Sequence, residues 1–162
     1  MIAASTSPPI RQFGPMVTPP RRLARNRCVP GPIQHGPSSR VNCVVDFYGP
    51  SDLTKSYGRS VDAAEVLPLF LGGDVEHERK RHILASPLFW VTPNAAPTLL
   101  IHGSEDKYVN YEQAGWMFQR LMESQVETEL LPLVGAGHGF KGEDAKKAEA
   151  AMVAWLDRHL KK

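Results

Sequence analysis

A carboxylate and an imidazole in this sequence are placed where they could carry proton-transfer chemistry. Asp106 follows an apolar run that ends at His102, and His138 lies between Gly137 and Gly139. A histidine between two glycines is presented by a backbone that can approach other groups closely, which favours a displayed imidazole over one packed in a core. A carboxylate that orients and charge-stabilises such a base forms two thirds of a nucleophile–base–acid catalytic unit.

Position alone leaves two alternatives open for the acid. Aspartate is common in turns, so residue 106 is equally compatible with a solvated turn. Glu105 competes for the same role, although we expect its side chain to point outward.

The runs around these residues alternate between strand and helix patterns. Strands are expected from Val41 to Tyr48 and over residues 98–102 and 126–133, the first of them apolar enough to be buried on both faces. Three helices are expected from helical spacing of apolar residues: residues 62–71, 110–122 and 143–160. This alternation implies right-handed parallel crossovers, so the predicted fold class is α/β, with about three parallel strands and helices on both sides of the sheet.

Two of these helices carry more detailed expectations. Asn110 is predicted to cap the middle helix, with Gln113 completing a capping box. The apolar stripe of that helix is expected to contain Ala114, Met117, Phe118, Leu121 and Met122. The buried face of the closing helix is expected to contain Ala145, Ala148, Met152, Trp155, Leu156 and His159.

Length and composition indicate one soluble domain. The chain has 162 residues and is 42% hydrophobic, enough for a buried core. It contains no apolar run of the roughly 18 residues that a membrane span needs, and no secretory signal pattern, which predicts a cytoplasmic protein. Two cysteines, Cys28 and Cys43, form neither a disulfide framework nor a metal-ligand spacing.

Residues 1–40 differ in composition from residues 41–162. They hold six arginines, eight of the 14 prolines and no acidic residue, whereas the remainder has 13 basic and 17 acidic side chains. Proline at that density blocks helix and removes backbone donors, so we expect an irregular or disordered arm. The arm could bind nucleic acid or a membrane surface through its arginines, or resemble a transit peptide. It could equally be a leader without function, including one translated out of frame.

Four motifs in the second part resemble the C-terminal half of an α/β-hydrolase, nearest to esterases and to acylaminoacyl-peptidase-like, prolyl-oligopeptidase-like and dienelactone-hydrolase-like members. They are Val44-Val-Asp-Phe-Tyr-Gly-Pro-Ser-Asp-Leu53, Ala85-Ser-Pro-Leu88, Pro97-Thr-Leu-Leu-Ile-His-Gly-Ser-Glu-Asp106 and Gly137-His-Gly-Phe140. The order and spacing of the motifs are together specific. The resemblance implies that Asp106 is the acid and His138 the base of a catalytic triad.

The nucleophile of that family, a serine in Gly-x-Ser-x-Gly, has no counterpart in this sequence, and neither has the oxyanion-hole loop. Ser51 lies at the correct edge of the predicted sheet, but its position in Gly49-Pro50-Ser51-Asp52 favours a turn residue. Cys43 is placed within an expected buried strand, where a thiol without a base is inert. The triad predicted from this chain is therefore incomplete.

Two functions follow as hypotheses. By resemblance the chain is a carboxylic ester hydrolase, esterase- or lipase-like, acting on a small-molecule ester, with the serine supplied by a segment it lacks. Alternatively it is an inactive hydrolase fragment that acts as an interaction module, because the strand from Val41 to Tyr48 would expose an unpaired edge and favour self-association. A third reading, in which the basic arm binds nucleic acid, is disfavoured.

No cofactor or metal is expected. The sequence has no phosphate-binding loop or dinucleotide fingerprint. His77 and His82 are five residues apart, which does not place them on one helical face, so Glu76, His77 and Glu78 are read as a solvated charged segment.

Overall fold

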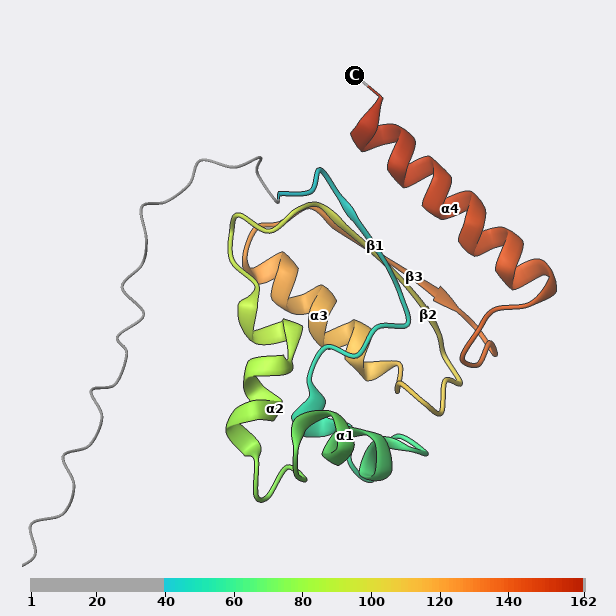
Figure 1. Cartoon of the computed structure of the whole chain (residues 1–162). Coiled ribbons are helices and arrows are strands. Elements are labelled where there is room, and N and C mark those ends of the chain that lie inside the picture. Colours follow the sequence, from blue (N-terminus) through green and yellow to red (C-terminus); the bar gives the residue numbers. More distant parts are fainter. Residues whose placement is uncertain (1–39, 162) are drawn as a thin grey trace, which may run out of the picture. The chain divides into compact units, whose positions relative to one another are not determined.

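Three short parallel strands form one sheet in the computed structural model, which describes residues 40–161 (Figure 1). They are β1 (Val44–Phe47), β2 (Thr98–Gly103) and β3 (Thr128–Leu133), in the order β1-β2-β3. Val45 pairs with Leu99, and Leu99 pairs with Glu129. The α/β class and the three predicted parallel strands are confirmed.

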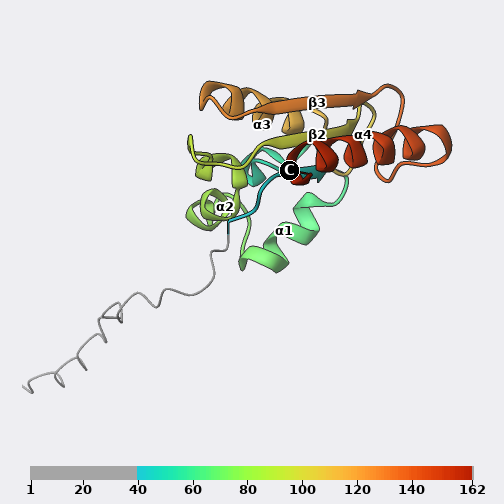
Figure 2. The ribbon, with the colours of Figure 1, turned by 90° about the horizontal axis from the view of Figure 1, so that it is seen from above.

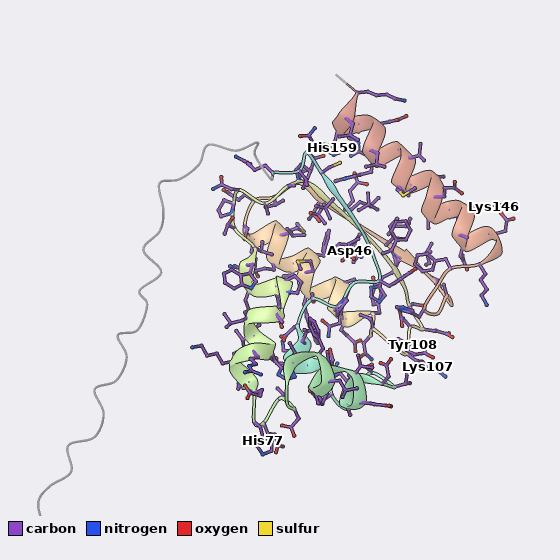
Figure 3. The ribbon with its side chains drawn as sticks, in the orientation of Figure 1. Asp46, His77, Lys107, Tyr108, Lys146 and His159 are labelled. Atoms are coloured by element: carbon purple, nitrogen blue, oxygen red, sulfur yellow. The ribbon has the colours of Figure 1, made fainter. Side chains whose placement is uncertain are left out.

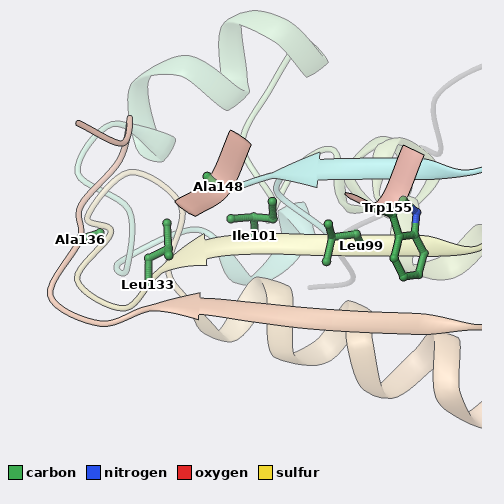
Figure 4. Close-up of a cluster of buried hydrophobic side chains, with 6 residues drawn as sticks. All are labelled: Leu99, Ile101, Leu133, Ala136, Ala148 and Trp155. Atoms are coloured by element: carbon green, nitrogen blue, oxygen red, sulfur yellow. The ribbon is translucent and has the colours of Figure 1, made fainter. Parts of the chain in front are cut away.

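Helices cover both faces of this sheet, as predicted (Figure 2). On one face, α4 (Gly142–Leu160) packs Ala148 and Trp155 against Leu99 and Ile101 of β2, and each of these side chains is nearly inaccessible (Figure 4). On the other face, α3 (Glu112–Glu123) packs Leu121 against Leu100. Successive residues of β2 therefore belong to two separate cores, because the side chains of a strand point alternately to its two faces.

The connection from β1 to β2 contains more helix than predicted. The expected helix is present as α1 (Ala63–Leu71), and it ends at Gly72 in the left-handed conformation. In addition the chain forms α2 (Arg79–Ala85) and two 3-10 turns, η1 (Leu53–Lys55) and η2 (Pro87–Trp90). The prediction of a single helical run here is wrong, because α2 has only His82 fully buried and so lacks an apolar stripe.

Three predictions about α3 are also wrong. The N-cap position belongs to Tyr111, while Asn110 donates its amide to the Arg59 carbonyl. Gln113 does not form a capping box, since its side chain is buried against the turn after β1. Met122, expected in the apolar stripe, is 57% exposed.

The first strand is less buried than predicted. Val44 is exposed and the other residues of β1 are half-buried, as is Cys43 just before it. The reason is that β1 pairs only with β2 among the described residues. Within the same part of the chain, no helix is both long and apolar enough to cross a bilayer. The predicted arm, with Cys28, lies outside the described residues except for Arg40.

Candidate active site

The loops after β2 and β3 are joined closely, which brings Asp106 and His138 together. The Ser104 N–H donates to the Leu133 carbonyl and the Glu105 N–H donates to the Ala136 carbonyl, each at 3.0 Å. Gly103 makes this approach possible, because a Cβ at that position would collide with the Ala136 carbonyl oxygen. The two loops at this end of the sheet therefore form a single support.

Asp106 is held from several directions. Its side chain is fully buried, and its Oδ1 accepts the N–H groups of Tyr108 at 2.8 Å and Val109 at 2.9 Å. Its Oδ2 accepts from Nδ1 of His138 at 2.8 Å. A carboxylate that accepts this many hydrogen bonds is fixed in orientation and satisfied in the absence of water. The reading of Asp106 as a solvated turn residue is excluded, and Glu105 is exposed, as expected.

His138 has the geometry of a base oriented by an acid. Because the carboxylate only accepts, the proton of the neutral imidazole lies on Nδ1, and the lone pair lies on Nε2. Nε2 has no hydrogen-bond partner among the described residues, and the side chain keeps 34% of its exposure. A reacting group could therefore reach this nitrogen from solvent.

Aromatic rings surround the imidazole. The Tyr48 ring centroid lies 4.4 Å from that of His138, and the Tyr108 centroid lies 5.4 Å away (Figure 3 shows Tyr108 in the loop after β2). Phe140 in turn contacts Tyr48 at 5.1 Å. The resemblance assigned no role to these rings, and no sequence spacing signals that they meet.

A second histidine stabilises the loop behind Asp106. His102 is 1% exposed, and its Nε2 donates to the Val109 carbonyl at 2.7 Å. The same nitrogen lies 3.5 Å from Oδ2 of Asp106. His102 thus holds the loop whose N–H groups bind the carboxylate.

Ser51 is not brought together with His138. It is 2% exposed, and its hydroxyl donates to the Gln113 carbonyl at 2.7 Å. The Gln113 side chain accepts from the N–H groups of Ser51 and Asp52 and donates to the Asp52 carbonyl. These contacts fasten the turn after β1 to α3, so the geometry agrees with the expectation that Ser51 is a turn residue.

An apolar groove opens beside β1 on the face that α3 covers. Its volume is about 750 Å³, and Val44, Leu53, Leu67, Phe70, Trp90 and Leu100 are among its lining residues. Asp46, labelled on β1 in Figure 3, also lines it. Burial raises the pKa of the Asp46 carboxyl above its ordinary value, while the Gly49 N–H and nearby His102 oppose that rise less strongly.

The charged segment before α2 forms local contacts. Asp74 accepts the His77 backbone N–H at 2.9 Å and the His77 ring at 2.7 Å, and these two bonds lower the pKa of Asp74. The contact with the ring also raises the pKa of His77. His82 is instead buried, with Nε2 at 2.8 Å from the Tyr57 hydroxyl. Within residues 40–161 no cluster of three or more histidine, cysteine or acidic side chains is arranged to hold a metal ion.

Sheet order, crossover helices and an acid–histidine pair on the loops after adjacent strands define part of an α/β-hydrolase fold, and comparisons with known proteins agree. The chain belongs to the BD-FAE family, which matches residues 26–121 and so begins inside the predicted arm. It is similar to Esterase LipC of Mycobacterium tuberculosis, with 38% identity over 113 residues, which are 67% of this chain and 28% of that protein.

Solved structures show the same partial fold. A puromycin-hydrolyzing peptidase of Mycobacterium tuberculosis has a TM-score of 0.66 at 26% identity, over 74% of this chain and 18% of that one. An acylaminoacyl peptidase of Pyrococcus horikoshii has a TM-score of 0.64 at 25% identity, covering 77% and 21%. A truncated carbohydrate esterase from gut microbiota, at 22% identity and a TM-score of 0.64, supports the fold over 76% and 44%. The chain therefore spans less than half the length of each of these proteins.

Proposed function

We propose that Asp106 and His138 are the acid and base of a serine-type carboxylic ester hydrolase acting on small-molecule esters. The observation that supports the proposal is the pair itself, a fully buried carboxylate at 2.8 Å from Nδ1 with Nε2 left for a reacting group. In such a unit Nε2 takes the proton of the nucleophile and later gives it to the leaving group. Ester substrates also agree with the esterase named among the relatives.

The nucleophile is proposed to come from a segment outside residues 40–161. No serine, threonine or cysteine of the described part bonds to His138, and the printed sequence has no Gly-x-Ser-x-Gly. A strand that paired in parallel with the side of β1 that is unpaired among the described residues would end level with Tyr48, whose ring contacts His138. The residue that follows such a strand would then be close to Nε2, the position that a nucleophile needs.

The isolated chain provides the first test. Hydrolysis of p-nitrophenyl acetate by the purified 162-residue protein should exceed that of His138→Ala by no more than an equal concentration of free imidazole contributes as background, because no hydroxyl or thiol of residues 40–161 bonds to His138. Hydrolysis that exceeds the background and is lost in His138→Ala would contradict an external nucleophile, and Ser51→Ala and Cys43→Ala would then locate an internal one.

A chimaera tests the roles of the pair directly. Residues 40–161 would replace the matching segment of Esterase LipC, so that the rest of that protein supplies the missing elements. We expect His138→Gln and Asp106→Asn to lower kcat by about a thousandfold or more, as triad substitutions do. His77→Gln, at an exposed position before α2, is the matched control and should leave kcat unchanged. A folded, active chimaera that is insensitive to His138→Gln would overturn the proposal.

The alternative is that the chain is an inactive hydrolase fragment that binds a partner through the free edge of β1. The apolar groove beside that edge favours it, since an exposed strand edge next to apolar surface is a template for pairing. The two proposals differ in the chimaera, where the alternative predicts folding without hydrolysis.

A further inference from the structure

Tyr48 combines an unusual backbone conformation with a contact to the proposed catalytic base. Its φ is +47°, in the left-handed region that residues with a Cβ rarely adopt. The other non-glycine residue of the described part with positive φ is Gln125, which follows α3 and closes the helix in an ordinary way. Tyr48 closes no helix, so its strain calls for another explanation.

Hydrogen bonds on both sides of Tyr48 hold this conformation. Its own N–H donates to the Ile101 carbonyl at 2.9 Å. The next N–H, that of Gly49, donates to Oδ1 of Asp46 at 3.0 Å. A Cβ at Gly49 would collide with that carboxylate, so a larger residue here would displace the Asp46 side chain. Asp46 is thus the side chain that fixes the peptide group following Tyr48.

The conformation brings the Tyr48 ring against the imidazole. The two ring centroids are 4.4 Å apart with an angle of 52° between the planes. Phe140 contacts Tyr48 edge-on and is itself packed against the core beneath α4. The Tyr48 ring is therefore braced and can act as a fixed wall.

His138 needs such a packing contact because its own backbone does little to orient the imidazole. It lies between Gly137 and Gly139, the latter with φ of +80°. The hydrogen bond from Nδ1 to Asp106 fixes one atom of the ring but leaves the ring free to pivot about that bond. A second contact against the ring is required to define where Nε2 lies.

We propose that Tyr48 is a positioning residue for His138, and that the Asp46 side chain holds Tyr48 in the left-handed conformation that places its ring against the imidazole. A positioning role for Tyr48 rests on the proposed function, because it assumes that His138 acts on a substrate. The contact and its dependence on Asp46 can be tested without any activity.

The readout is the Nδ1–H proton of His138 in the full 162-residue chain labelled with 15N-histidine, assigned by its loss in His138→Gln. Its exchange rate with solvent reports how often the imidazole leaves Asp106. Tyr48→Ala should accelerate exchange about two- to tenfold, the range expected for losing one aromatic contact. Tyr48→Phe keeps the ring and should exchange like the native chain.

Tyr108→Ala is the matched comparison. Tyr108 also contacts His138, but at 5.4 Å and from a side chain that is 52% exposed. Its removal should accelerate exchange less than Tyr48→Ala does. An equal or larger effect would contradict the special role assigned to Tyr48.

Asp46 variants test the second half of the proposal. Asp46→Ala removes the acceptor of the Gly49 N–H, so it should accelerate exchange at His138 although the Tyr48 ring is still present. Asp46→Asn keeps an oxygen acceptor and should restore native exchange. If Asp46→Ala and Asp46→Asn behave alike, Asp46 does not act through this hydrogen bond and that half is wrong.

If Tyr48→Ala fails to fold, Tyr48→Gly takes its place, since glycine adopts positive φ without strain and also lacks the ring. The same acceleration is then expected. Native exchange in a folded Tyr48→Ala or Tyr48→Gly chain, or no protected Nδ1–H signal in the native chain, would overturn the inference. An inactive LipC chimaera with the predicted exchange pattern would instead overturn the proposed function and leave this inference standing.

Discussion

The two faces of the sheet differ in how completely they are covered. Under α4, Ile101 is inaccessible and Trp155 is 1% exposed, so the core on that face is closed. On the other face, the groove of about 750 Å³ beside β1 leaves Phe70 72% and Trp90 63% exposed. Apolar side chains of this size are rarely gathered at a surface without a partner, which supports the proposal that this face contacts a partner.

The candidate site draws its support from the closed face. Leu133 and Ala136 belong to the core beneath α4, and they immediately precede the loop that carries His138. Tyr48, in contrast, directly follows β1, the strand whose other side is unpaired among the described residues. Asp106 and His138 are thus brought together by loops that a closed core supports, while Tyr48, which contacts the imidazole, follows a strand with one neighbour among the described residues.

The largest expected effect is in the closed core. Trp155→Ala should lower the free energy of unfolding by about 3–5 kcal/mol, because it removes a buried ring and leaves a cavity. Phe70→Ala, in the groove, is the control and should change stability by less than about 0.5 kcal/mol. Urea unfolding followed by circular dichroism measures both. Similar losses of unfolding free energy in the two variants would mean that the two faces contribute equally to stability.

A second large effect is expected at Gln113, the residue of α3 that holds the turn after β1. Gln113→Ala leaves the Ser51 and Asp52 N–H groups without their buried acceptor and should destabilise the chain by about 2–4 kcal/mol. Gln119→Ala, on the same helix but bonded only to exposed Glu123, should change stability by less than about 0.5 kcal/mol. If Gln113→Ala proved as mild as its control, the turn after β1 would be held by other contacts.

The sequence predicts the regular elements of the fold but not the contacts that Gln113 makes. The strands and the buried face of α4 follow from apolar periodicity, which is a local signal. The bond between Ser51 and Gln113 joins residues 62 positions apart, so nothing local distinguishes Gln113 from a capping residue. Helix α2 was missed for a related reason, since it is short, charged and stabilised by the burial of a single histidine.

The candidate site also contains residues that the sequence predicts and residues that it does not. Asp106 and His138 could be selected because their motifs and the family resemblance point to them, and the structure brings them within hydrogen-bonding distance. Tyr48 and Asp46 could not, because φ at Tyr48 and the bond from Gly49 to Asp46 depend on how β1 ends against β2. The apolar run of β1 predicts cover on both faces, but a strand with an unpaired edge, which the sequence also predicts, leaves its side chains only partly buried.

A smaller effect is expected at the free edge of β1. The native chain is predicted to self-associate there, and Val44→Lys should weaken the association about tenfold or more, because a charge on an edge strand opposes pairing. Val153→Lys, at an exposed valine of α4, is the matched control. Size-exclusion chromatography with light scattering over a range of concentrations measures the change. A native chain that stays monomeric, or equal effects of the two lysine substitutions, would contradict self-association through the edge of β1.

The smallest effect concerns the Asp46 carboxyl, whose raised pKa means that the folded chain binds this proton more tightly than the unfolded chain does. Stability from this group is therefore greatest below the ordinary pKa of 3.8 and falls as pH rises through the raised value. Asp46→Asn removes the charge, so the variant should be more stable than the native chain at pH 7, with a difference that shrinks toward pH 3.5. Urea unfolding of both chains at the two pH values tests this. A difference that grows as pH falls would show that the carboxylate is stabilised in the fold, and the open face would then tolerate charge better than its apolar lining indicates.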